Sequence, residues 1–186
     1  MCIRDSSEPV NGFTASDIVV SGGAKGTFTG SDGDSTYTLV VTPPADATGT
    51  ITVDVAQGVA TDGVGNPNTA AIQATQAFDT QAPTLAITDD INAAIATGDV
   101  TFSFGFSEPV NGFTASDITV SGGTKGTFTG SDGDSTYTLV VTPTPNSAGT
   151  ITLDVGANAV TDAAGNPNTA AVQVCLLYTS PSPRDS

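Results

Sequence analysis

One long stretch of the chain occurs twice. Residues 7–73 align without a gap on residues 107–173, and roughly three quarters of the aligned positions are identical. The strings SEPVNGFTASDI, KGTFTGSDGDSTYTLVVTP and GNPNTAA are the same in both copies. Such self-similarity restricts the chain to folds in which one unit recurs, here with a period of about 100 residues. The differences between the copies cluster at 44–48 and 56–60 and at their counterparts, which is typical of surface loops.

The two copies differ in what precedes them. The second copy follows a segment, residues 84–106, that has no counterpart before the first copy. The sequence therefore predicts a complete module at residues 79–174, linker included. It also predicts a truncated module at residues 7–78 that lacks its first two strands.

Both ends of the chain break the repeat pattern. Residues 1–6 (MCIRDS) stand where the second copy has TFSFGF, and residues 175–186 (CLLYTSPSPRDS) begin just after the last repeat-like residue. Both strings resemble translations of adapter sequences used in DNA sequencing, so we expect them to be non-native, tag-like segments outside the fold. Because both cysteines and both arginines lie in these segments, we expect no disulfide in the modules.

Charge excludes several classes of partner. Lys25 and Lys125 are the only cations of the repeat modules, and the whole chain has a formal net charge of −15. Such acidity repels phosphate backbones, so we expect no nucleic-acid partner. Anionic membrane surfaces are disfavoured for the same reason. No apolar run approaches the length of a membrane span, so we expect no membrane insertion of this segment.

Alternation of apolar and polar residues is the main signal of secondary structure. Every second residue of 100–106 is Val or Phe, and the same period of two appears at 137–142 and 151–155. Shorter runs of this kind lie at 85–87, 118–120 and 172–174. Turn-forming strings rich in Gly, Asp, Asn and Pro separate the runs. About seven strands in about 90 residues predict an all-β fold of tandem Ig-like β-sandwich modules.

The repeat strings also resemble a known family. FSEPVNGFTASDITVSGG, TYTLVVTP and AVTDAAGNPN are similar to the bacterial Ig-like repeats of very large secreted or cell-surface proteins. The resemblance covers nearly all of residues 7–174. Many members of that family are adhesin-type proteins with long arrays of modules. The resemblance therefore implies an extracellular or bacterial cell-surface location, with neighbouring repeats of the same chain as partners.

Calcium is the cofactor that the acidic turns suggest, because it prefers carboxylate and carbonyl oxygens. If the strands run alternately up and down, the loops SEPVNG, GSDGDS and VTDAAGNPN fall at the end of the module that receives the linker. Asp79, Glu108 and Asp162 are then expected to converge there, with Asp132 or Asp134 nearby. The alternative is that all five are separate, solvated turn residues. The string DGDS in particular also fits a polar hairpin turn.

The modules are poorly provided for catalysis. They contain neither His nor Cys and hence no ordinary nucleophile–base pair, so an enzyme is not expected. The leading hypothesis is a structural spacer or stalk of a bacterial adhesin, because a spacer needs many equivalent units.

The alternative is a module that binds a glycan, or another cell-surface or matrix ligand of unknown identity, through the end loops at 44–48 and 56–60. These loops carry no aromatic residue, which favours the spacer. Tyr137 alternates with Leu139 and Val141, so we expect it in the core rather than in a sugar-stacking role.

Overall fold

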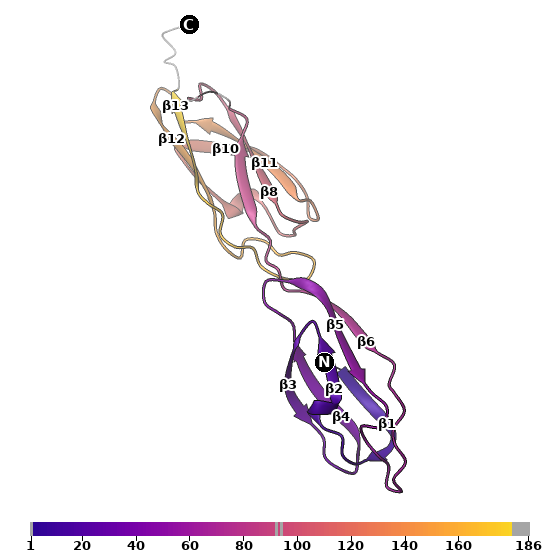
Figure 1. Cartoon of the computed structure of the whole chain (residues 1–186). Coiled ribbons are helices and arrows are strands. Elements are labelled where there is room, and N and C mark those ends of the chain that lie inside the picture. The colour runs from indigo at the N-terminus through magenta and orange to yellow at the C-terminus, as the bar shows by residue number, and fades with distance from the viewer. Residues whose placement is uncertain (1, 92, 94, 180–186) are drawn as a thin grey trace. The chain divides into compact units, whose positions relative to one another are not determined.

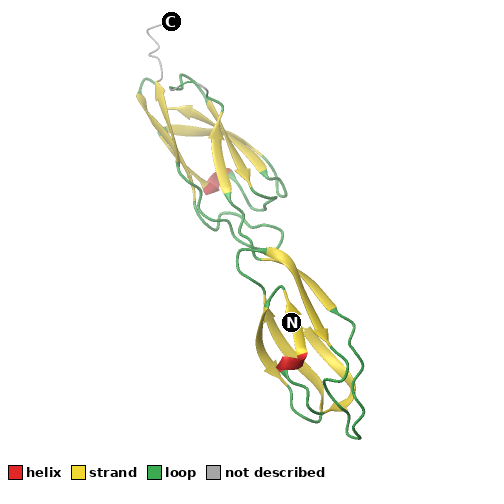
Figure 2. Cartoon of the chain, viewed as in Figure 1, coloured by secondary structure: helices red, strands yellow, loops and turns green. Residues whose placement is uncertain are grey.

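The computed structural model describes residues 2–91, 93 and 95–179, with side chains from Ser7 onward. The chain forms two compact units, Met1–Gln81 and Ala82–Ser186 (Figure 1). Both units consist of β-strands and loops, and each contains one short 3-10 turn, η1 (Ala15–Asp17) or η2 (Ala115–Asp117) (Figure 2). The two units can therefore be compared strand by strand.

The described residues of the second unit form seven strands in two antiparallel sheets, ordered β10-β11-β8-β7 and β13-β12-β9. Their bounds are β7 (Leu85–Asp89), β8 (Val100–Phe106), β9 (Ile118–Ser121), β10 (Gly123–Thr129), β11 (Thr136–Pro143), β12 (Ala148–Val155) and β13 (Val174–Thr179). This arrangement confirms the predicted all-β, Ig-like fold with about seven strands in a complete module.

Strand β8 shows how the alternating sequence produces the core. It lies between β11 and β7, and its Val and Phe side chains are buried at every second position. Phe102 and Phe104 are fully buried, whereas Ser103 between them is only partly buried. Because successive side chains of a strand point to opposite faces, one face of β8 packs entirely into the sandwich.

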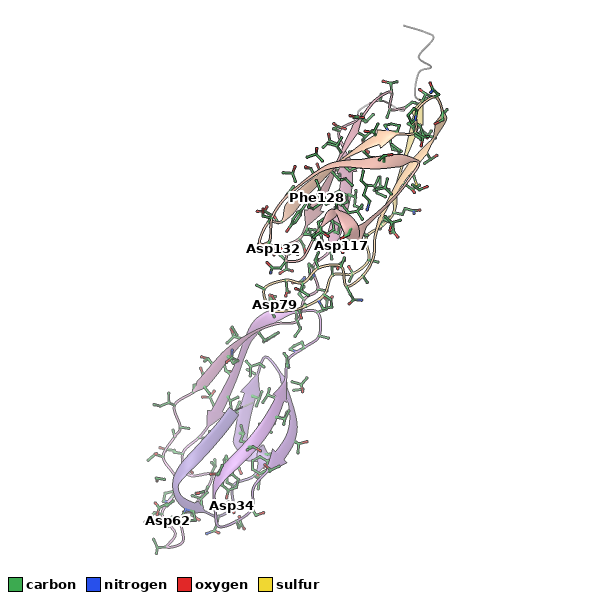
Figure 3. All side chains as sticks on the ribbon, turned by 180° about the vertical axis from the view of Figure 1, so that it is seen from behind. Asp34, Asp62, Asp79, Asp117, Phe128 and Asp132 are labelled. Carbon is green, nitrogen blue, oxygen red and sulfur yellow. The ribbon has the colours of Figure 1, made fainter. Side chains whose placement is uncertain are left out.

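An aromatic cluster centres on Phe113, from the loop that follows β8. Its ring meets those of Phe104, Phe106, Phe128 and Tyr137 edge-on, with ring centroids 5.1 to 5.8 Å apart. Figure 3 labels Phe128 within this unit. Pairs with this geometry each contribute about 0.5–1.5 kcal/mol beyond the area they bury. The buried position of Tyr137 confirms that it is a core residue.

In the first unit, the part that the structure describes has six strands in two three-stranded sheets, ordered β1-β4-β3 and β2-β5-β6. Their bounds are β1 (Cys2–Val10), β2 (Ile18–Ser21), β3 (Ala24–Thr29), β4 (Asp34–Thr42), β5 (Thr48–Val55) and β6 (Ala74–Asp79). Strand β1 takes the place that β8 has in the second unit. Among the described residues of this unit, no strand corresponds to β7.

The N-terminal residues differ from the expectation that they lie outside the fold. Arg4 lies opposite Tyr37 in the β1–β4 pair, just as Phe104 lies opposite Tyr137 in the β8–β11 pair. The tag-like segment is therefore included in a strand. With it, the first unit lacks one strand of the complete module rather than two. Backbone pairing at a sheet edge requires N–H and C=O groups rather than a particular side chain, so a foreign segment can supply it.

The C-terminal segment shows a similar difference. Residues 175–179 belong to β13, which pairs with β12 in the register that β6 uses with β5. The Tyr178 ring lies against Gly149, as Phe78 lies against Gly49 in the first unit. Leu176 and Tyr178 are partly or fully buried and Leu177 is exposed, so the segment places its side chains on alternate faces as a strand does. Residues 180–186 lie outside the described residues. The expected strand at 172–174 begins only at Val174.

Candidate metal centre

Asp162 lies in the loop between β12 and β13, and its side chain is only 3% exposed. Its Oδ1 accepts a hydrogen bond from the backbone N–H of Asn166 at 2.8 Å, and its Oδ2 accepts one from the Asn166 side-chain amide at 2.8 Å. The Asp162 N–H in turn donates to the Asn166 carbonyl at 3.1 Å. The carboxylate is thus held in one orientation by its own loop.

Asn168 fixes this loop to the sandwich. Its Oδ1 accepts hydrogen bonds from the N–H groups of Ala159 and Val160 at 2.7 and 3.0 Å. Its Nδ2 donates to the carbonyls of Gly156 and Thr169 at 3.0 and 2.7 Å. The side chain is 2% exposed, and all four of its hydrogen-bonding positions are used.

The sequence by itself indicates no role for Asn168. Its occurrence in both copies is the one signal that pointed to more.

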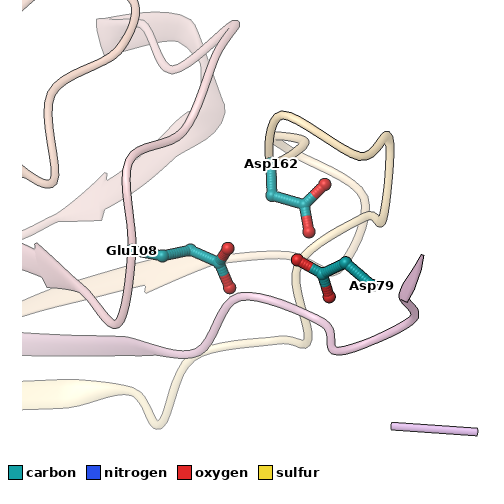
Figure 4. Close-up of side chains that lie close together, drawn as sticks. All are labelled: Asp79, Glu108 and Asp162. Atoms are coloured by element: carbon teal, nitrogen blue, oxygen red, sulfur yellow. The ribbon is translucent and has the colours of Figure 1, made fainter. Parts of the chain in front are cut away.

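Glu108 lies just after β8 and is half-buried. Both Glu108 and Asp162 belong to the second unit, and their carboxylate oxygens lie within 4.8 Å of each other (Figure 4). The Asn111 N–H donates to the Thr161 carbonyl at 2.8 Å and ties the two loops together. The structure thus brings these two predicted residues to one place within one unit.

Asp79 is the last residue of β6 and belongs to the first unit. Its Oδ1 accepts a hydrogen bond from the Gln81 N–H at 2.9 Å. The Thr80 hydroxyl donates to the Pro44 carbonyl at 2.7 Å, which anchors the segment to the first unit. Only Thr80 and Gln81 separate Asp79 from the first residue of the second unit.

Asp132 and Asp134 lie in the loop between β10 and β11, where Figure 3 labels Asp132. Asp132 Oδ1 accepts a hydrogen bond from the Gly112 N–H at 2.8 Å. Asp134 Oδ2 accepts one from the Ser131 N–H at 2.8 Å. Within the described part of the chain, neither residue belongs to a group of three carboxylates. The bond of Asp134 is that of a polar turn, whereas the bond of Asp132 joins this loop to the loop that follows β8.

The electrostatics of Asp162 favour its charged form. Burial raises the pKa of its carboxyl group, but hydrogen bonds from the side chain and backbone of Asn166 and from the backbone of Gly165 and Ala164 outweigh that effect. The net pKa lies below the ordinary value of 3.8. At neutral pH, Asp162 is therefore an anion close to a second carboxylate. Such a pair provides hard oxygen ligands for a divalent cation.

The first unit repeats these loops with different surroundings. Asp62 accepts the same two bonds from Asn66, at 2.8 and 2.7 Å, and its pKa is also lowered by them. Asp62 and Asp34 mark one end of this unit in Figure 3. Glu8, the counterpart of Glu108, is exposed. The hydrogen-bonded loop around Asp62 or Asp162 is therefore common to both repeats. A buried aspartate beside a half-buried glutamate is found in the second unit.

Comparison with known proteins assigns these modules to a family. A family model described as a bacterial Ig-like domain matches residues 6–77 and 79–177. The chain belongs to this family. Its second bacterial Ig-like match begins at Asp79, the residue that also ends β6. No curated protein matches the chain.

The family assignment indicates a structural repeat module of a kind that is typically extracellular or surface-associated. In the described part of the chain, no helix has the length and apolar character needed to cross a membrane.

Proposed function

We propose that this pair of bacterial Ig-like modules is a spacer or stalk segment of a cell-surface or secreted adhesin. Its partners are then the neighbouring repeats, and its location is outside the cell. The observation that carries the proposal is the equivalence of the two units. Ile18 pairs with Val55 in the first unit, and Ile118 pairs with Val155 in the second. A spacer requires interchangeable units, whereas a binding module requires a surface that distinguishes it from its neighbours.

The loops support the same proposal. Asn68 makes the same four hydrogen bonds as Asn168, so both units close this loop in the same way. The large apolar side chains exposed among the described residues are scattered Val, Ile and Leu residues, and none is aromatic. Glycan sites usually offer aromatic rings in a concave surface, so the loops favour extension over binding.

Display on bacteria would test the spacer. Arrays of one, two and four copies of the chain are placed between a cell anchor and a biotin-acceptor tip, and capture by streptavidin-coated beads is measured. We expect capture to increase with copy number and to remain unchanged when the sequence of 144–148 replaces that of 44–48. Capture that is independent of copy number would contradict the proposal.

A second part of the proposal concerns calcium. Asp162 and Glu108 place two carboxylates close together in the second unit, and a cation would relieve their repulsion. Asp79 supplies a third carboxylate through a two-residue tether, which spans at most about 10 Å from Asp79 to Ala82. Calcium bound by these residues would stiffen the linker. Asp132 and Asp134 are left out of the proposed site, because among the described residues they belong to no group of three carboxylates.

Calorimetric titration of the chelator-treated chain with Ca²⁺ tests this part separately. We expect one site per chain, weakened more than about tenfold by Glu108→Gln or Asp162→Asn, and by Asp79→Asn if the tether supplies a ligand. Glu8→Gln is the matched control in the first unit and should leave binding unchanged. Absence of binding heat and of any rise in melting temperature would end the calcium proposal and leave the spacer proposal standing.

The alternative function, binding of a glycan or matrix ligand through the loops at 44–48 and 56–60, rests on the sequence differences between copies. A glycan array probed with the chain tests it. Saturable binding that disappears when the sequence of 156–160 replaces that of 56–60 would establish this function instead of the spacer.

A further inference from the structure

An asparagine followed by glycine occurs at the same place in each unit. Asn111 and Gly112 lie in the loop between β8 and η2, and Asn11 and Gly12 lie in the loop between β1 and η1. All four residues are exposed. Among the described residues, neither asparagine side chain makes a hydrogen bond, in contrast to the fully bonded side chain of Asn168. The side-chain amide carbon of both asparagines is therefore open to reaction.

Asparagine before glycine is prone to spontaneous deamidation, because glycine has no side chain to hinder attack on the amide. The backbone nitrogen of the glycine forms a bond to Cγ of the asparagine. The bond from Cγ to Nδ2 breaks, and ammonia leaves with the proton of the glycine N–H. Water then opens the resulting cyclic imide on one side or the other and leaves aspartate or isoaspartate. The reactants are the chain itself and water, so no enzyme is needed.

The attacking nitrogen is held by a carboxylate in both units. The Gly112 N–H donates to Asp132 Oδ1 at 2.8 Å, and the Gly12 N–H donates to Asp32 Oδ1 at 2.8 Å. This nitrogen must lose its proton in order to react. A carboxylate beside it opposes that loss, because the hydrogen bond would be broken and the negative charge that develops on nitrogen would be repelled. A carboxylate is also far too weak a base to remove the proton itself.

The backbone of each asparagine is held as well. The Asn111 N–H donates to the Thr161 carbonyl at 2.8 Å, and the Thr161 N–H donates to the Asn111 carbonyl at 3.2 Å. Asn11 and Thr61 exchange the same two bonds, at 2.8 and 3.1 Å. Closure of the cyclic imide requires rotation of the asparagine backbone, which would break these bonds. The backbone pairing and the carboxylate therefore oppose the same reaction.

We propose that Asn111 and Asn11 are sites of spontaneous deamidation, and that Asp132 and Asp32 slow the reaction by holding the adjacent glycine N–H. This gives the first aspartate of the repeated string DGDS a role outside the candidate metal site. Either product at position 111 adds a carboxylate three positions after Glu108. The isoaspartate form also lengthens the main chain by a carbon, so position 111 cannot keep both of its bonds to residue 161.

Peptide mass spectrometry of the full chain, incubated in mildly alkaline buffer, measures conversion at each asparagine separately. We expect Asp132→Ala to accelerate deamidation at Asn111 more than about fivefold and to leave Asn11 unchanged, because only one hydrogen bond is lost. Asp32→Ala should have the reverse effect. Each unit is thus the control for the other. A protein isoaspartyl methyltransferase, used as a reagent, identifies the isoaspartate product.

A neighbouring carboxylate separates the hydrogen bond from the charge. Asp134→Ala removes the same charge from the same loop but leaves the bond between Gly112 and Asp132 in place. It should therefore leave the rate at Asn111 unchanged. Asn166 is an internal reference, because Pro167 follows it and has no N–H that could attack. Conversion at Asn166 should stay negligible in every variant.

The unchanged chain supplies a test that does not depend on the folding of a variant. Deamidation at Asn111 should be more than about tenfold slower in the folded chain than in urea, because unfolding releases both the glycine N–H and the asparagine backbone. Amide spectra report whether each variant still folds. Equal rates in the folded and unfolded chain would overturn the proposal, as would an unchanged rate at Asn111 in folded Asp132→Ala. A slower rate in that variant would show that the carboxylate promotes the reaction instead.

Discussion

The carboxylate of Asp162 accepts two hydrogen bonds from Asn166, one from its backbone N–H and one from its side-chain amide, each at 2.8 Å. Asp62 and Asn66 make the same pair of bonds in the first unit. A carboxylate with several donors is stabilised in its charged form. The stability of the loop that carries Asp162 therefore depends on pH.

Asn166→Ala should raise the pKa of Asp162, because burial would then be opposed by fewer donors. A carboxyl group with a lowered pKa in the folded state contributes stability above its ordinary pKa, and that contribution is lost as pH falls through the folded-state value. The acid unfolding midpoint of the second unit should therefore move to higher pH. Carboxyl-carbon resonances followed against pH give the measurement. Asn66→Ala is the control and should leave the pKa of Asp162 unchanged.

Asn168→Ala should destabilise the second unit by about 3 kcal/mol, because two backbone N–H groups and two carbonyls lose their partner in a closed loop. Asn68→Ala should have an effect of similar size on the first unit. Urea unfolding followed by resonances of each unit measures both. Gln76→Ala, at an exposed strand residue, should cost less than about 0.5 kcal/mol. A cost below about 1 kcal/mol for both asparagine variants would contradict the role assigned to them.

Ala60→Val should stabilise the first unit, because residue 60 lines a cavity in this unit and the second unit has Val160 at this position. The two added carbons are worth about 1.5 kcal/mol if they fill that space. The reverse change, Val160→Ala, should cost about 2 kcal/mol in the second unit. Calorimetric unfolding of the two variants checks the pair. Destabilisation by Ala60→Val would show that the cavity cannot accept the larger side chain.

Gly130→Ala should destabilise the second unit by about 3 kcal/mol or more, because an added Cβ would overlap the ring of Tyr137 and the backbone φ is +137°. Gly133 has a φ of +88° and open space around it. Gly133→Ala should therefore cost only the backbone strain, about 1 kcal/mol. Thermal unfolding of both variants separates strain from overlap, and equal effects would exclude overlap as the main cause.

Residues 7–78 expressed alone should be only marginally folded. Removing residues 2–6 takes away the pairing of Cys2 through Asp5 with β4 and leaves that side of β4 unpaired. The measurement is thermal unfolding of two expressed segments, residues 7–78 and residues 1–81, whose cooperativity is compared. A sharp transition of 7–78 would show that the remaining strands suffice.

Much of the fold was predictable from local patterns. The period of two in β8 and β11 placed Phe102 and Leu139 in the core, and both are fully buried. The ends of the chain were predicted less well, because judging a segment foreign says nothing about whether its backbone can pair. Tyr178 packs against Gly149 although it lies in the tag-like tail.

The candidate site was predicted only in part. The loops that carry Glu108 and Asp162 do meet within the second unit, as the alternating strand directions indicate. Asp132 belongs to the same type of acidic turn, yet its carboxylate is taken by the Gly112 N–H. The identity of an acidic residue does not reveal which N–H group will donate a hydrogen bond to its carboxylate.

Repeat length, strand character and acidity follow from the chain's own residues, because alternation, turn residues and charge act over a few neighbouring positions. Which carboxylates converge depends on strand register and on hydrogen bonds between distant residues. Asp162 and Glu108 are 54 positions apart in the sequence, and their oxygens come within 4.8 Å because the loops that follow β8 and β12 meet through the hydrogen bond from Asn111 to Thr161. Alternating strand directions indicate which loops share one end of the module, but the contacts between particular side chains are set by packing and register.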